Sequence, residues 1–287
     1  MKPVLVVPAR QVQAVASIVV LAASAAALAA APTVRTDSFL GLDGVRVVVQ
    51  VVSADPTASR LQVVHAPAAV ALQDKPATLE GLSSSQAFVR PADKWRALFN
   101  AGFSSYRTDV PVGLLVSDGK VLSPIDSSPA RVAGGSGSAA CPVAAEAKFR
   151  FSGVLCVRSD NQAWQILRTQ DYQPGACRQA VQAGPLLVEP GGTVGVCEAT
   201  PDAKPSARTV ACIDAANRLH MVQAAPTHLH PLAQWLAAGP LRCQVAMNLA
   251  GADQSGWIQL STWRRQIPEA HAGVKAALPS ALLLSER

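Results

Sequence analysis

Four segments of the chain carry amide, guanidinium, carboxylate or hydroxyl side chains, and three of them also contain glycine. They are residues 99–103 (Phe-Asn-Ala-Gly-Phe), 182–188 (Gln-Ala-Gly-Pro-Leu-Leu-Val), 208–214 (Arg-Thr-Val-Ala-Cys-Ile-Asp) and 248–256 (Asn-Leu-Ala-Gly-Ala-Asp-Gln-Ser-Gly). Glycine allows close approach to the backbone, so an adjacent amide can act together with backbone N–H donors. The guanidinium of Arg208 is a planar fork that matches the oxygens of a phosphate. Such residues suit an oxygen-rich, anionic ligand.

The order of these segments resembles that of the phosphodiester glycosidase family. Two further matches, Pro111–Leu114 and Asp118-Gly119-Lys120, lie between the first and second segments, and Leu278–Leu283 is similar to the last strand of that family. The resemblance spans about residues 40 to 287. It implies an exported hydrolase that cleaves a sugar from a phosphate-linked glycan or glycolipid. The family also includes bacterial envelope proteins labelled as exopolysaccharide biosynthesis proteins.

Cleavage of such a bond requires donors for the phosphate, stabilisation of an oxocarbenium-like centre, and a group that activates water. The planar fork of Arg208 suits the phosphate clamp, Asp253 is the candidate base, and these two are the catalytic candidates. The substrate-binding candidates are Asn100, Gln182, Gly184, Asn248, Gly251 and Ser255. No cofactor or metal is expected, because His228 and His230 would diverge by roughly 200° on a helix.

One position departs from the family pattern and leaves the activity open. The family turn usually reads Asn-Leu-Asp-Gly-Gly, whereas this chain has Ala250 at the Asp position and Ala252 at the second glycine. Asp253 supplies a carboxylate three positions later. Either Asp253 takes over the role or the protein has lost activity. A glycan-binding or exopolysaccharide assembly protein of the same fold is therefore the alternative to an enzyme, and a structural envelope protein is a third hypothesis.

Each candidate also has a purely structural interpretation. Arg208 can be a solvated charge at the start of a strand, Asn248 can bond local backbone, and Asp253 can be a turn residue. The glycines can serve turns and close packing. Ser255 has no Gly-x-Ser-x-Gly elbow and no positioned histidine, which argues against a nucleophile. Trp257 follows the turn directly and is either a core residue or a platform on which a sugar stacks.

Residues 1–31 have the composition of a secretory signal. Lys2 and Arg10 precede an apolar segment, no charged residue occurs from Gln11 to Val34, and small residues follow at Ala27–Ala31. This pattern predicts a signal peptide, with an uncleaved N-terminal anchor as the alternative. Residues 32–287 are then expected to form one periplasmic or secreted domain, whose membrane contact is limited to such an anchor.

The cysteines indicate disulfides in an exported chain. Their number is even and none forms a Cys-x-x-Cys pair; they are Cys141, Cys156, Cys177, Cys197, Cys212 and Cys243. In an oxidising compartment, six cysteines predict three disulfides among fifteen possible pairings. Proximity along the chain favours Cys141–Cys156, Cys177–Cys197 and Cys212–Cys243. A catalytic cysteine is disfavoured, because disulfide formation consumes the thiolate.

Composition and charge limit the class of partner. The chain has 287 residues, of which 49% are hydrophobic and 5% aromatic. Without Lys2 and Arg10, 23 basic residues remain of the 25, and against 19 acidic ones they give a net charge of +4. Scattered basic residues and few aromatic ones exclude a nucleic-acid surface. The expected partner is a phosphorylated or phosphate-linked carbohydrate.

Strand signals dominate the part of the chain that must position these residues. β-Branched runs at residues 44–52 and 60–65 flank Asp55-Pro56 and predict a strand, a turn and a second strand. Residues 113–121 predict a hairpin around Asp118-Gly119, and residues 209–222 predict another. The expected fold is therefore α+β in a single domain, mostly antiparallel sheet with few helices.

One helix is predicted between the third and fourth segments. Thr227 is the expected N-cap, Pro231 lies in the first turn, and Gly239-Pro240 ends the helix. The apolar positions share one face; they are Leu229, Leu232, Ala233, Leu236 and Ala237. Residues 244–249 then predict a strand that enters the glycine-containing turn, and residues 133–140 predict a surface loop.

Overall fold

A computed structural model of the chain describes residues 31–71, 77–85, 94–104, 110–128, 151–197, 204–251, 254–260 and 277–287. Its strands are β1 (Thr33–Leu40), β2 (Arg46–Ala54), β3 (Ser59–His65), β4 (Arg96–Asn100), β5 (Phe103–Ser104), β6 (Pro111–Val112), β7 (Leu115–Ser117), β8 (Lys120–Ser123), β9 (Gly153–Arg158), β10 (Trp164–Arg168), β11 (Cys177–Ala183), β12 (Leu186–Glu189), β13 (Thr193–Val194), β14 (Ser206–Asp214), β15 (Leu219–Thr227), β16 (Cys243–Gly251), β17 (Trp257–Leu260) and β18 (Ser280–Glu286). Its helices are α1 (Ala66–Val70), α2 (Leu79–Ser83), α4 (Leu229–Ala238) and the short 3₁₀ helix η2 (Thr169–Asp171).

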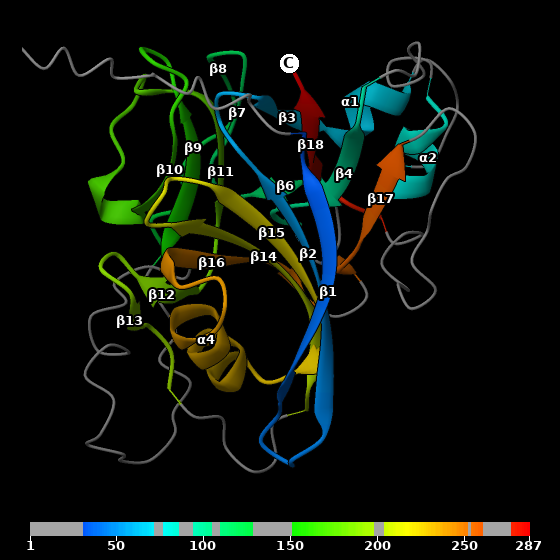
Figure 1. Ribbon diagram of the computed structural model, residues 1–287. Coiled ribbons are helices and arrows are strands. Elements are labelled where there is room, and N and C mark those ends of the chain that lie inside the picture. Colours follow the sequence, from blue (N-terminus) through cyan, green and yellow to red (C-terminus); the bar gives the residue numbers. More distant parts are fainter. Residues whose placement is uncertain are drawn as a thin grey trace, which may run out of the picture.

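Three antiparallel sheets carry the fold (Figure 1). The largest has the strand order β1-β2-β15-β14-β16-β12-β13, the second β10-β9-β11-β7-β8, and the third β17-β4-β18-β3. The expected antiparallel architecture with few helices is confirmed. Because its helices are short and few, the described part of the chain is mostly β rather than an even mixture of α and β. None of the described helices is long and apolar enough to cross a membrane.

The central strands of the seven-stranded sheet, β14, β15 and β16, are mostly buried on both faces. One face packs Val51, Val210 and Val222 against Leu232 and Leu236 of α4. The other face contributes to a central core that it shares with the other two sheets; this core includes Phe99, Leu155, Trp164, Met221, Met247 and Leu282. Strand β2 is buried on both faces only at Val51 and Val52, whereas Val48 nearer its start is 47% exposed.

Strands β2 and β3 do not pair with each other. The predicted turn is present, since the N–H of Ser59 donates to the carbonyl of Asp55 (2.9 Å). However, β2 has β1 on one edge and β15 on the other, so both of its edges are occupied. The chain therefore crosses to the four-stranded sheet, where β3 pairs with β18.

The two predicted hairpins are confirmed. Strands β7 and β8 pair across Asp118-Gly119, and β14 pairs with β15 over a longer stretch than predicted. Helix α4 is confirmed as well, but its N-cap is His228, because Thr227 is still paired with Ser206 in the hairpin. The predicted loop at residues 133–140 lies outside the described part of the chain.

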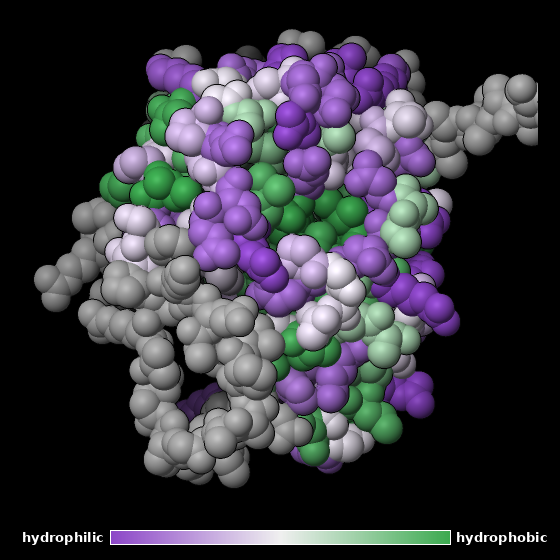
Figure 2. Space-filling model, turned by 90° about the vertical axis from the view of Figure 1, so that its left-hand side faces the viewer, coloured by the Kyte–Doolittle hydropathy of each residue, from purple (hydrophilic) through white to green (hydrophobic). Residues whose placement is uncertain are grey.

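The outer surface beside the five-stranded sheet is predominantly hydrophilic. Figure 2 shows hydrophilic side chains around smaller groups of hydrophobic ones on this side of the molecule. The high apolar fraction of the described chain is accordingly held mainly between the sheets and beneath α4.

Two disulfides join neighbouring strands within the sheets. Cys156 on β9 bonds to Cys177 on β11, and Cys212 on β14 bonds to Cys243 on β16. The predicted Cys212–Cys243 pair is thus confirmed, whereas Cys141–Cys156 and Cys177–Cys197 are wrong. Proximity along the sequence failed because β9 and β11 are adjacent in the sheet, which brings the Cα atoms of Cys156 and Cys177 to 5.5 Å. Cys197 is also disulfide-bonded, and Cys141 lies outside the described residues.

Loss of the disulfide beneath α4 should destabilise the fold. Cys212→Ala/Cys243→Ala is expected to lower the free energy of unfolding by about 2–4 kcal/mol, because the open chain regains conformational entropy. Denaturant titration of the wild type and this double variant measures the difference. Peptide mapping without reduction checks the pairing independently: a peptide that links Cys156 to Cys141 would contradict the structure.

Candidate functional site

A buried polar cluster joins two of the sheets near the last segment of the predicted site. It comprises Asn100 at the end of β4, Thr209 on β14, Gln223 on β15 and Ser255, each at most 2% exposed. Thr209 Oγ1 lies 3.0 Å from Asn100 Oδ1, 2.8 Å from Gln223 Oε1 and 3.0 Å from Ser255 Oγ. We call these four residues the Thr209 cluster. It brings the predicted residues Asn100 and Ser255 together through a residue that belonged to the matched segment but was assigned no role.

The backbone of Gly256 closes the Thr209 cluster. Its N–H donates to Asn100 Oδ1 (2.8 Å), and its carbonyl accepts from the N–H of Asn100 (3.2 Å). Gln223 Nε2 in turn donates to Ser255 Oγ (2.8 Å). The cluster thereby fixes the chain after the glycine-containing turn against β4 and β14.

One donor of the cluster is left over. In the described part of the chain, Asn100 Nδ2 is buried and has no hydrogen-bond partner. A buried donor without a partner costs about 1–3 kcal/mol, so native structures retain few of them. Such a donor is suited to an acceptor atom of a ligand.

Arg208 lies on the opposite face of β14 from Thr209, because successive strand residues alternate. It pairs with Gly251 on β16, and a methyl group added at Gly251 would lie only 2.5 Å from Arg208 Nη1. The glycine therefore makes room for the guanidinium. No carboxylate of the described residues forms an ion pair with Arg208, and its buried Nε has no partner. Burial lowers the pKa of Arg208, but arginine stays protonated at neutral pH.

Asn248, which also lies on β16, forms a separate contact with Gly184. Asn248 Nδ2 donates to the carbonyl of Gly184 (3.1 Å), and Asn248 Oδ1 is buried without a partner among the described residues. A side chain at Gly184 would collide with the backbone N of Ser152 at 2.8 Å. Gly184 therefore serves close packing, and the free acceptor of Asn248 is what this pair offers to a ligand.

Gln182 is set apart from the other candidates by its complete set of protein partners. Its Oε1 accepts from the N–H groups of Leu114 (3.0 Å) and Asp126 (2.8 Å). Its Nε2 donates to the carbonyls of Asp126 (2.9 Å) and Phe151 (3.1 Å). The amide has no remaining capacity for a ligand in this arrangement, so Gln182 positions the chain around it.

The β-bulge at Leu249 sets the geometry between Asn248 and Gly251. Thr209 pairs with Ala250 and Val210 with Asn248, which leaves Leu249 as the extra residue. The carbonyl of Leu249 accepts from the N–H of Gly102 (3.0 Å), whose φ of 80° favours glycine. Bulges of this kind often lie beside active sites, where they redirect side chains.

A model of the phosphodiester glycosidase family (NAGPA) matches residues 93–284, which is more than half of the chain. The chain belongs to the phosphodiester glycosidase family. The predicted resemblance is thereby confirmed. Among curated proteins, no sequence matches the chain.

Solved structures share the fold of this family member at low sequence identity. The catalytic domain of zebrafish N-acetylglucosamine-1-phosphodiester alpha-N-acetylglucosaminidase, auto-inhibited by its pro-peptide, is 15% identical, with a TM-score of 0.53 over 88% of this chain and 81% of that one. A hypothetical protein from Synechocystis has 15% identity and a TM-score of 0.55 over 90% and 62% of the two chains. A Burkholderia pseudomallei protein described as a candidate exported protein has 13% identity and a TM-score of 0.52 over 83% and 74%.

Asp253 and Ala250 both belong to the turn at which this chain departs from the family pattern. Asp253 lies outside the described residues, so its role stays a prediction. Ala250, at the position where the family has Asp, is buried and paired with Thr209. Its methyl group therefore lies on the same face of the seven-stranded sheet as Thr209. A carboxylate at this position would have the hydrogen-bond donors of the Thr209 cluster nearby.

Trp257 is a core residue and not a sugar platform. It is 3% exposed, its ring stacks on Phe99 with centroids 5.6 Å apart, and its Nε1 donates to Gln50 (2.8 Å). Pairing of β17 with β4 aligns Trp257 with Phe99 and turns both rings into the core. The sequence left a core residue and a sugar-stacking platform as alternatives for Trp257. Its position on β17 in the four-stranded sheet makes it a core residue.

A serine, a histidine and an aspartate form a chain of hydrogen bonds elsewhere in the seven-stranded sheet, which the sequence did not reveal. Ser53 Oγ lies 2.8 Å from His220 Nδ1, and His220 Nε2 lies 3.1 Å from Asp214 Oδ2. Both oxygens of Asp214 are already engaged by Arg218, through its N–H and its guanidinium. The arrangement therefore closes the β14–β15 hairpin rather than forming a nucleophilic triad.

A matched pair of glycine variants tests whether Arg208 offers its guanidinium to an anion. Gly251→Ala should displace the end of the flexible Arg208 side chain and weaken the binding of inorganic phosphate at least about tenfold, since one charge-assisted hydrogen bond contributes about 1.5–3 kcal/mol. Calorimetric titration measures the affinity. Gly41→Ala is the control, because its added methyl group would meet only Asp43 Oδ1 (3.1 Å), the carbonyl of Val45 and Val47 Cγ2 (both 3.4 Å); equal affinities for the two variants would contradict the assignment.

The buried histidine should make stability sensitive to mild acid. Burial lowers the pKa of His220 below its ordinary value, although the hydrogen bond to Asp214 opposes this shift; the positive charges of Arg218 and Arg35 lower it further. The unfolded chain then binds more protons, so the free energy of unfolding is highest above pH ~6.5 and falls as the pH is lowered from there. Denaturation of His220→Gln between pH 5 and 7.5 should give a flatter profile than the wild type. Parallel profiles would contradict this explanation.

Proposed function

We propose that the chain is an exported phosphodiester glycosidase that releases a sugar from a phosphate-linked glycan or glycolipid. The observation that carries the proposal is the pair of buried donors, Arg208 Nε and Asn100 Nδ2, that have no acceptor among the described residues. Asn100 ends β4 and Arg208 lies on β14, two strands of different sheets that the Thr209 cluster joins. A phosphodiester supplies the acceptor oxygens and the negative charge that such donors lack.

Each residue has a role in the proposed reaction. Arg208 binds the phosphate and stabilises the charge that the departing group gains. Asp253 takes a proton from water as that water attacks the anomeric carbon, and the bond from this carbon to the phosphate oxygen breaks with its electron pair on the phosphate. Phosphate is a good leaving group, so little protonation by a general acid is needed. Asn100 and Asn248 bind substrate oxygens and hydroxyls, and Ser255 and Gln182 position the surrounding chain.

The name of the zebrafish enzyme with the same fold supports this substrate class. That enzyme is an N-acetylglucosamine-1-phosphodiester alpha-N-acetylglucosaminidase. By extension, we propose a sugar-1-phosphodiester as the bond that is cleaved here. Export is supported by the disulfides, which persist in oxidising compartments.

A glycan-binding protein without turnover is the second candidate, and Ala250 is the observation that favours it. Its methyl group replaces the carboxylate of the family on the face that carries the Thr209 cluster. In that case Arg208 still binds the phosphate, but no base activates water. Ala250→Asp would then introduce hydrolysis into an inactive protein.

Hydrolysis of sugar-1-phosphodiesters by the disulfide-bonded protein distinguishes the two candidates. The enzyme should release free sugar, and Asp253→Asn should lower kcat by about 10²-fold or more, as expected for loss of a general base. Arg208→Ala should lower kcat/KM by a similar factor, whereas Arg46→Ala on the exposed start of β2 is the control and should leave it unchanged. Phosphate-dependent binding with no release of sugar from any substrate would refute the enzyme and support the binder.

A further inference from the structure

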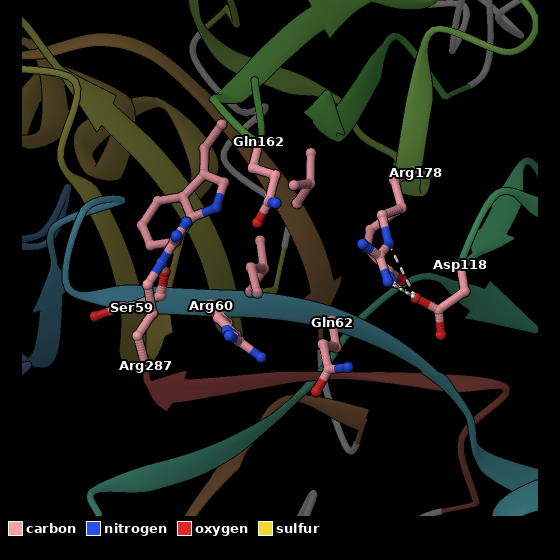
Figure 3. A pocket seen from close by; sticks show the side chains of 11 residues that line it. Ser59, Arg60, Gln62, Asp118, Gln162, Arg178 and Arg287 are labelled. Carbon is pink, nitrogen blue, oxygen red and sulfur yellow. Dashed lines mark hydrogen bonds and ion pairs between the residues drawn. The ribbon is translucent and has the colours of Figure 1, made fainter. Parts of the chain in front are cut away.

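A second candidate binding site lies at the far end of β18 from Asn100. It is a pocket of about 180 Å³ (Figure 3). Ser59, which lines it, pairs with Glu286 at the C-terminal end of β18, whereas Asn100 pairs with Ala281 near the other end. Ligand pockets for drug-sized molecules are typically ~300–1,000 Å³, so this one suits a single small group.

The lining of this pocket is positively charged. Three arginines, Arg60, Arg178 and Arg287, face one carboxylate, Asp118. Asp118 is engaged by Arg178, whose Nε and Nη2 lie 3.2 Å and 3.0 Å from its Oδ1. Within the described residues, neither Arg60 nor Arg287 forms an ion pair. Two arginine side chains of the lining therefore have no ion-pair partner among the described residues.

The walls of the pocket are fixed by the core and by hydrogen bonds. Trp164 is 1% exposed and forms part of the floor. Gln179 is buried, accepts from the N–H of Val63 (2.9 Å) and donates to Asp118 (3.0 Å), so it ties the edge of β3 to the β7–β8 hairpin. Arg287 Nε donates to the carbonyl of Ser59 (3.1 Å), which leaves its terminal nitrogens free for a ligand.

Gln162 adds an amide group from a constrained backbone position. Its φ is 57°, in the region that favours glycine, and its N–H donates to the carbonyl of Arg158 (3.2 Å). A residue other than glycine in this region costs about 1–3 kcal/mol and persists where its surroundings impose it. Gln162 therefore lines the pocket from a strained turn, opposite the amide of Gln62 on β3.

We propose that this pocket binds the carboxylate or phosphate group of an anionic sugar. The forks of Arg60 and Arg287 match two oxygens of either group, and the amides of Gln62 and Gln162 donate to and accept from neighbouring hydroxyls. This site is separate from the proposed hydrolytic site. It would hold an acidic unit of a glycan while the phosphodiester at Arg208 is bound or cleaved.

Titration calorimetry with glucuronate, glucose 6-phosphate and neutral glucose tests the proposal. The two anionic sugars should bind, and glucose should not. Arg60→Ala/Arg287→Ala should weaken the binding of the anionic sugars at least about tenfold, whereas Arg46→Ala should bind them as tightly as the wild type. A stronger effect for glucuronate identifies carboxylate as the preferred group, and a stronger one for glucose 6-phosphate identifies phosphate.

Asp118→Asn is a second test, because a purely structural role of the pocket residues would not make anionic sugars bind more tightly. Asn-Gly suits this hairpin turn as well as Asp-Gly, and the substitution removes the negative charge and releases Arg178. Binding of the anionic sugar should become several-fold tighter. No binding by the wild type, equal binding of glucose, or unchanged affinity in the double arginine variant would overturn the proposal. None of these results depends on hydrolysis, because calorimetry measures binding and none of the three sugars contains a phosphodiester bond.

Discussion

The hydroxyl of Thr209 is the contact on which the geometry of the candidate site depends. It is fully buried between sheets and lies within hydrogen-bond distance of three other side chains and of the N–H of Gly256. Buried polar groups are stable only when they are satisfied, so β4, β14, β15 and the chain after the glycine-containing turn must meet at this point. Arg208 precedes Thr209 directly, and its position follows from that of the cluster.

Much of the local structure could be predicted from the sequence, because it depends on neighbours along the chain. The hairpin at Asp118-Gly119 and helix α4 follow from turn chemistry and apolar spacing. The partners of β2 and β3 could not be predicted in this way, since strand order depends on which edges remain free. The same reason explains the wrong pairing of Cys156 and Cys177, which lie on strands that are adjacent only in the sheet.

The site was predictable at the level of segments and less so at the level of side chains. Asn100 and Ser255 contact each other through Thr209, whereas Arg208 lies on the other face of β14 and contacts Gly251. The sequence did not show that the amide of Gln182 would be saturated by four backbone groups. Nor did it show that Trp257 would stack on Phe99 in the core. Burial and hydrogen-bond partners arise from contacts that no single segment contains.

We propose above all that the buried donors of Arg208 and Asn100 bind oxygens of a phosphodiester substrate. The side-chain N–H resonances of arginine and asparagine in ¹⁵N-labelled protein report on this directly. Adding a sugar-1-phosphodiester should shift the Arg208 Nε–H resonance, assigned by its loss in Arg208→Lys, together with the Asn100 amide. If both resonances stay in place while the ligand saturates the protein, the phosphate is bound elsewhere and the account is wrong.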